Sequence, residues 1–147
     1  MEIKKILFAA DFSEGTSNAL SYAVEFANKF AARLYMLHVV HNVFIYPGMH
    51  IPHNSFDIMN KELEASAQKA MHKLCLSIGD ACSNMESRVV HGVPYEEILK
   101  FASENKIDLI ITGTHGRKGL DRAIIGSTAE RVVRNSHCPV MTIRMPA

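Results

Sequence analysis

Short apolar segments alternate with longer amphipathic segments along the whole chain, and this alternation limits the folds available to it. The apolar segments have the length of strands and cover residues 3–10, 34–40, 85–90, 107–112 and 140–143. The segments between them carry apolar residues at helical spacing and cover residues 13–30, 57–83, 94–102 and 127–135, with a loop predicted at 42–56. Strands that alternate with helices predict an α/β fold, in which helices cover both faces of a parallel sheet.

The strand order follows from the same pattern. A chain of 147 residues suits one domain, and right-handed crossovers leave few orders for its sheet. We expect a single-domain, three-layer sandwich over residues 1–147, with five parallel strands in the Rossmann-like order 3-2-1-4-5. In this order the winding reverses between the first and fourth strands, and ligands bind outside the carboxyl ends of the strands there. A site is therefore expected after Ala10 and after Thr112.

Composition excludes several classes of protein. The net charge of +1 gives no electrostatic reason to expect nucleic-acid or membrane-surface binding. No apolar run approaches the roughly 20 residues of a membrane-spanning helix, and the first residues lack the pattern of an export signal. The cysteines form no CxxC pair, so reduced thiols and a cytoplasmic location are expected.

Glycines are concentrated after the predicted fourth strand, at Gly113, Gly116 and Gly126. Glycine lets the backbone approach a bulky anion and permits positive φ angles, and successive N–H groups can line an anion-binding nest. Judged by spacing alone, a phosphate cradle and a loop whose glycines only form turns are equally good interpretations. The segment is neither a P-loop nor a dinucleotide fingerprint, since it lacks GxxxxGK[ST] and follows the fourth strand instead of the first.

Ser127 is the predicted N-cap of the last helix, and Glu130 would complete a capping box with it. Gly126, Ser127 and Thr128 would then lie at the N-terminus of that helix. Unpaired N–H groups and the helix dipole favour phosphate at such a position. Arg117 could add a cationic contact.

The spacing Gly113-x2-Gly116-x9-Gly126-Ser127 resembles the phosphate-binding signature of the ATP-binding branch of the universal stress protein family. The likeness extends to ILFAADFSE at residues 6–14, LHVV at 37–40 and HCPV at 137–140, and covers essentially the whole chain. It implies an adenine nucleotide alpha hydrolase-like fold. It also implies a stress-response regulator that binds ATP, with Mg²⁺ or Mn²⁺ accompanying the phosphates.

The resemblance also assigns roles to single residues. Asp11 matches an acidic residue near the ribose and phosphates and is the candidate metal ligand, although a cap for the following helix is an alternative interpretation. Ala10 and Val39 match positions around the adenosine, while plain core packing explains Val39 equally well. His41 stands where relatives often have an acidic residue, which leaves the adenine side of the pocket open. The phosphate-contacting positions implied are Gly113, Gly116, Gly126, Ser127 and Thr128, with His115 and Arg117 inside that segment.

Two further features lie outside this signature. His50 and His53 have a spacing that a transition metal could use, but no HExxH companion is present, so a solvated or lid-like loop is expected instead. The last strand, 140–143, would be an apolar sheet edge, and such an edge invites pairing with another chain. The resemblance implies homodimerisation through this strand, Val140 to Ile143.

Three functions are compatible with these observations. The first is an ATP-binding regulator with slow or no hydrolysis, and no residue is assigned as catalytic. The second is an ATPase or autophosphorylating phosphotransferase, with His115 as a candidate base and Ser127 or Thr128 as acceptors. The third is a nucleotide-free interaction module, against which the intact glycine signature argues.

Overall fold

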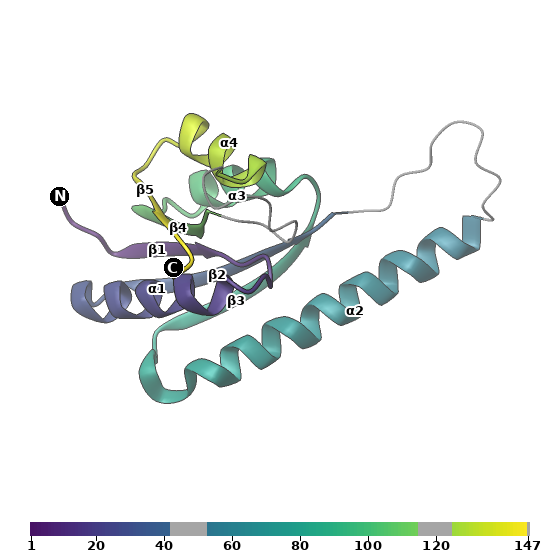
Figure 1. The fold of residues 1–147 in the computed structure, drawn as a ribbon, viewed down its shortest axis with the longest axis horizontal. Helices are drawn as coiled ribbons and strands as arrows, with labels where there is room; N and C mark the ends of the chain where they lie inside the picture. Colours follow the sequence, from purple (N-terminus) through teal and green to yellow (C-terminus); the bar gives the residue numbers. More distant parts are fainter. Residues whose placement is uncertain (42–52, 115–124, 147) are drawn as a thin grey trace.

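The computed structural model describes residues 1–41, 53–114 and 125–146, which form a sheet between two layers of helices (Figure 1). The strands are β1 (Lys5–Ala9), β2 (Arg33–Val40), β3 (Met85–His91), β4 (Leu109–Gly113) and β5 (Val140–Ile143). The helices are α1 (Thr16–Phe30), α2 (His53–Ile78), α3 (Pro94–Glu104) and α4 (Ser127–Asn135), and a 3₁₀ turn (Gly79–Ala81) follows α2. The strands pair in parallel in the order β3-β2-β1-β4-β5, which confirms the predicted fold class and strand order.

The central strands hold the core together. β1 and β4 are almost wholly apolar because helices cover them on both faces, as is usual in parallel sheets. Alternate side chains of a strand point to opposite faces, so two core clusters form. One contains Ile6 and Phe8 of β1 and lies under α1 and α2, while the other contains Leu7 and lies under α3 and α4.

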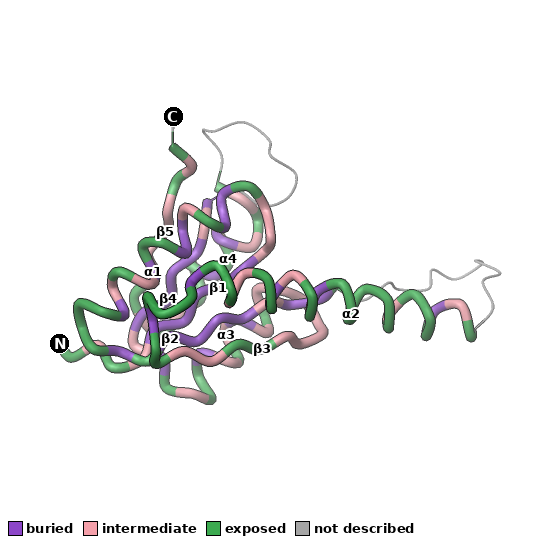
Figure 2. The backbone as a smooth tube through the Cα atoms, turned by 90° about the horizontal axis from the view of Figure 1, so that it is seen from below, coloured by how far each residue is buried: buried purple, intermediate pink, exposed green. Residues whose placement is uncertain are grey.

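Helix α2 extends well past the sheet (Figures 1 and 2). It begins at His53, so the predicted loop 42–56 is wrong at its carboxyl end. Met71 and Ile78 on its inner stripe are buried against the sheet, but Leu63 on the same stripe is 40% exposed. The reason is that the N-terminal half of α2 lies beyond the carboxyl end of β2, where no strand is available to cover it (Figure 1).

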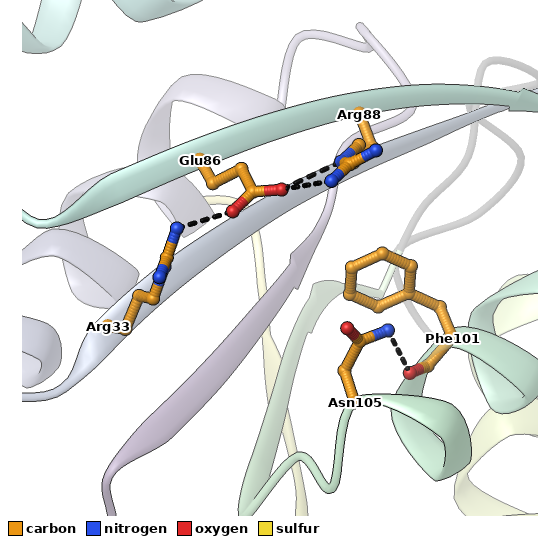
Figure 3. Close-up of polar contacts among 5 residues, drawn as sticks. All are labelled: Arg33, Glu86, Arg88, Phe101 and Asn105. Atoms are coloured by element: carbon orange, nitrogen blue, oxygen red, sulfur yellow. Dashed lines mark hydrogen bonds and ion pairs between the residues drawn. The ribbon is translucent and has the colours of Figure 1, made fainter.

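Strand β3 is one edge of the sheet and carries charged side chains (Figure 3). Glu86 Oε2 accepts a hydrogen bond from Arg33 Nη2 of β2 at 2.5 Å, and its Oε1 accepts one from Arg88 Nε at 2.8 Å. The hydrogen bond from Arg88, reinforced by the charges of Arg88 and Arg33, lowers the pKa of the Glu86 carboxyl below its usual value. At the end of α3, Asn105 Nδ2 donates to the Phe101 carbonyl at 2.9 Å (Figure 3).

We predict that Arg88→Met raises the pKa of Glu86 toward its ordinary value, and that Arg33→Met raises it by less. A depressed carboxyl pKa stabilises the fold above the ordinary pKa, and this contribution is lost as the pH falls through the depressed value. Titration of the Glu86 carboxyl ¹³C resonance measures both changes. Identical titration curves for Arg88→Met and the unchanged protein would contradict the assignment.

A second prediction concerns the turn between β3 and α3. Gly92 has φ +147°, and a Cβ there would lie 2.6 Å from Glu97 Cγ, whereas Gly79 has φ +54° and open space around it. Gly79→Ala should therefore cost about 1 kcal/mol of stability, from its backbone conformation alone. Gly92→Ala should cost more, up to about 3 kcal/mol, because the strain is greater and Glu97 must move. Urea denaturation compares the two variants, and equal losses would show that the contact with Glu97 has no effect.

Candidate functional site

A cavity of about 660 Å³ opens at the carboxyl ends of β1, β2 and β4. Small-molecule sites usually have volumes of roughly 300–1,000 Å³. The floor comes from the ends of the strands, and the walls come from α2, from the start of α3 and from the start of α4. The cavity thus lies where the winding of the sheet reverses, between β1 and β4, which is where the strand order predicts a site.

Asp11 lines this cavity two residues after β1. Its Oδ1 accepts hydrogen bonds from the Ser13 backbone N–H at 2.9 Å, from Ser13 Oγ at 2.6 Å and from Thr16 Oγ1 at 2.8 Å. These bonds hold the turn that leads into α1, whose N-cap is Gly15. Asp11 therefore organises the start of α1, close to the capping role considered above, and at the same time is one of the residues that line the cavity.

The residues on either side of Asp11 are tightly held. The Ala10 N–H donates to the Leu37 carbonyl at 2.8 Å, and the Ala10 carbonyl lies 2.7 Å from His38 Nδ1. Phe12 has φ +59°, a left-handed conformation that costs a residue with a side chain about 1–2 kcal/mol. Its ring lies against the His38 imidazole, with a centroid separation of 4.2 Å.

Thr114 and the start of α4 form a second part of the cavity wall. The Thr114 N–H donates to the Ile143 carbonyl at 3.0 Å, and the Gly126 N–H donates to the Thr114 carbonyl at 2.6 Å. α4 then begins at Ser127 with Gly126 as its N-cap. The first turn of a helix presents N–H groups that have no partner within the helix, and Ser127 and Thr128 lie in this turn and line the cavity.

The predicted capping box is wrong. Ser127 is the first residue of α4 instead of its N-cap, and no side chain caps this helix. The cause is that the Gly126 carbonyl already accepts the Glu130 N–H at 3.0 Å, which closes the first turn one residue earlier than expected. The Glu130 side chain instead forms an ion pair with Arg134, one turn further along α4.

Gly113 and Gly126 do not need positive φ angles, contrary to the sequence-based expectation. Gly126 has φ −58°, and among the described glycines only Gly79 and Gly92 have positive values. Among the described residues, a Cβ on Gly113 would approach only the Ile143 carbonyl, at 4.0 Å. Any amino acid could adopt the backbone conformation of Gly126, so its φ angle does not require glycine. The contribution of both glycines is therefore the absence of a side chain beside the cavity.

Most of the residues singled out from the sequence meet at this cavity. Seven of the candidate nucleotide-contacting residues line it: Ala10, Asp11, Val39, Gly113, Gly126, Ser127 and Thr128. His41, which follows β2, lines it as well. His115, Gly116 and Arg117 lie outside the described residues, as do His50 and the side chain of His53. In the described part of the chain, no cluster of three His, Cys, Asp or Glu side chains could hold a metal ion. No described helix is long and apolar enough to span a membrane.

Sequence reasoning missed several residues of the site. His38 and Phe12 line the cavity beside Asp11, and α2 contributes Leu63, Ser66 and Ala67. Leu63 and Ala67 belong to the apolar spacing that predicts this helix, and Ser66 was not singled out, because periodicity cannot separate a buried face from a cavity wall. For His38, the available signal was a polar residue inside the apolar run of β2.

Comparison with known proteins gives matches over nearly the whole chain. A family model described as the universal stress protein family matches residues 2–144. Universal stress protein MJ0531 of Methanocaldococcus jannaschii is 34% identical over 144 residues, which cover 97% of this chain and 83% of that protein. The structure of universal stress protein UspA from Lactobacillus plantarum matches with a TM-score of 0.86 at 26% identity, over 98% of this chain and 99% of that one.

Two solved universal stress proteins of lower identity contain a nucleotide. One is a complex with cAMP, with a TM-score of 0.62 at 21% identity over 98% of both chains. The other, from Archaeoglobus fulgidus, is a complex with dAMP, with a TM-score of 0.58 at 23% identity over 97% of this chain and 99% of that one. At these identities the likeness establishes only the shared fold.

Proposed function

This chain belongs to the universal stress protein family, and we propose that it is a regulator that binds ATP in the cavity at the β1–β4 reversal, with slow or no hydrolysis. The observation that carries the proposal is the convergence of Asp11 and the first turn of α4 on one cavity. A carboxylate and a helix N-terminus that line one cavity suit a nucleotide whose phosphates are accompanied by a divalent cation.

In this proposal the phosphates lie against Gly126, Ser127 and Thr128. Each contact between an anion and a helix N-terminus contributes about 0.3–2 kcal/mol, so several must act together to reach micromolar affinity, about −8 kcal/mol. Asp11 is the one Asp or Glu among the described residues that line the cavity, and it would hold Mg²⁺ or Mn²⁺. Mg²⁺ commonly binds to one or two carboxylates together with the phosphates of its substrate, so the donor set fits.

The adenosine would occupy the apolar part of the same cavity. Val39 and Ala10 lie at the strand ends, and Ile98 and Leu63 lie on the helices that face them. Apolar walls with a few placed polar groups are typical of sites for flat aromatic ligands. The complexes of two structural neighbours with cAMP and dAMP support an adenine nucleotide.

The described residues favour ATP binding without fast ATP hydrolysis. Phosphoryl transfer needs a positioned nucleophile, a base and several charges on the phosphates. The described lining has one carboxylate, and the Oδ1 atom of that carboxylate already accepts three hydrogen bonds. Single-turnover hydrolysis with Mg²⁺ tests this point, and a rate near 1 s⁻¹, common for enzymes, would make the protein an ATPase instead.

We predict that Gly126→Val weakens ATP binding about 100-fold or more without unfolding the protein. Valine tolerates φ −58° and ψ 152°, so the backbone is preserved, but its side chain fills space beside the first turn of α4. Gly126→Ala adds one methyl group and should give a smaller loss. Calorimetric titration measures affinity, and thermal unfolding is the control for stability.

The identity of the ligand is tested on the unchanged protein. Nucleotide released from freshly purified protein by denaturation is identified by mass spectrometry, and titrations with ATP, ADP and GTP compare the phosphates and the base. We expect an adenine nucleotide with the tightest binding for ATP in the presence of Mg²⁺. Unchanged ATP affinity in Gly126→Val, or the absence of binding by any of these nucleotides, would refute the proposed site.

The proposal includes a homodimer formed through β5. This strand is an edge of the sheet, its four residues carry no charge, and all four are only partly buried. Exposed apolar edge strands readily pair with another chain. The other edge, β3, carries Glu86 and Arg88 and is poorly suited to such pairing.

We predict that Thr142→Pro converts the dimer to a monomer that still folds. The carbonyls of Pro139 and Ile143 accept hydrogen bonds from the β4 side. Because backbone groups alternate in direction along a strand, the N–H of Thr142 faces the outer edge, and proline removes this donor without breaking the β4 ladder. Light scattering gives the mass, and a monomeric mass for the unchanged protein would eliminate the dimer.

A further inference from the structure

We infer that His38 is a positioning residue for Asp11: its imidazole holds the residues on both sides of Asp11 and so sets how the Asp11 carboxylate faces the cavity. The inference rests on the proposed function, because the carboxylate is taken to act on the nucleotide and its cation. His38 lies on β2, whereas Asp11 follows β1, so the two are linked only through the fold.

The first contact of His38 is with the residue before Asp11. Its Nδ1 lies 2.7 Å from the Ala10 carbonyl, and because a carbonyl only accepts, Nδ1 carries the proton and donates. The N–H of Ala10 donates to the Leu37 carbonyl at 2.8 Å. Both polar groups of the Ala10 backbone are therefore bonded to consecutive residues of β2, and the peptide that enters Asp11 has a fixed orientation.

The second contact of His38 is with the residue after Asp11. The Phe12 ring packs on the imidazole with centroids 4.2 Å apart and planes tilted by 35°. Phe12 has φ +59°, which residues with a side chain rarely adopt unless their surroundings hold them there. The contact with His38 is such a restraint, and release of Phe12 to a right-handed or extended backbone would rotate the peptide that leaves Asp11.

The carboxylate is thus restrained from two directions. Ser13 and Thr16 bond to Oδ1 and fix Asp11 relative to α1. His38 fixes the backbone of Asp11 relative to the sheet, through Ala10 and Phe12. Because Asp11, Phe12 and His38 all line the cavity, a change in this arrangement alters the shape presented to the ligand as well as the stability of the turn.

A double-mutant cycle separates positioning of Asp11 from simple packing. ATP affinity with Mg²⁺ is measured calorimetrically for the unchanged protein, His38→Ala, Asp11→Ala and the double variant. We expect His38→Ala to weaken binding about tenfold when Asp11 is present and less than about twofold when it is absent, because residues that act through each other are not additive. Equal weakening in both backgrounds would overturn the inference and leave the proposed function intact.

Two further variants keep the test informative if His38→Ala unfolds. His38→Asn retains an N–H donor at the position of Nδ1 and should recover part of the affinity lost in His38→Ala. Phe12→Gly removes the ring but accepts the left-handed backbone at no steric cost, so its effect isolates the ring contact. No recovery by His38→Asn, in a protein that remains folded, would count against the contact with Ala10.

A readout without nucleotide distinguishes failure of the inference from failure of the proposed function. The carboxyl ¹³C resonance of Asp11 in the ligand-free protein should shift in His38→Ala and stay unchanged in His72→Ala, which alters an exposed histidine of α2. An unshifted resonance in both variants would overturn the inference. A shift in His38→Ala from a protein that binds no nucleotide would support the positioning role and reject the proposed ligand.

Discussion

Burial of the central strands on both faces is the constraint on which the rest of the structure depends. β1 and β4 must be apolar along nearly their whole length, so they cannot carry polar groups for chemistry until they end. Asp11 and Thr114 accordingly lie just beyond the ends of β1 and β4, where they line the cavity. The same burial fixes the strands in register, so the two wall segments that follow them are held at a constant separation by the core.

Because polar residues follow the ends of apolar strands, the cavity combines an apolar surface with a polar one. Its floor and helical walls are extensions of the core and can bury a flat apolar group by the hydrophobic effect. Its rim is built from Asp11 and from the start of α4, where helix geometry leaves N–H groups without a partner within the helix. The described residues thus place an apolar surface beside the start of a helix, and Asp11 is the one acidic side chain among them that lines the cavity.

The fold could be predicted from the sequence because strand-like and helical spacings of apolar residues extend over whole segments. Single exceptions within a segment therefore do not hide the pattern. The site could be read only in part. Spacing located Gly113, Gly126 and Ser127 at the cavity but placed the N-cap of α4 one residue too late, since the Gly126 carbonyl accepts the Glu130 N–H and closes the first turn there. His38 was missed because its two partners, Ala10 and Phe12, are far from it in the chain and are reached only through strand pairing. The start of α2 was placed too late because Pro47, Gly48 and Pro52 predict a loop and mask the helix that begins at His53.

The two edges of the sheet differ in chemistry, and this difference limits how copies of the protein can join. Glu86 and Arg88 place charges along the β3 edge, whereas β5 has none. Edge-to-edge growth into a fibril requires that both sides of a sheet accept a new strand. In the proposed dimer the sheet is extended through β5 only and closes after a single symmetric addition, so the asymmetry between β3 and β5 would prevent open-ended polymerisation.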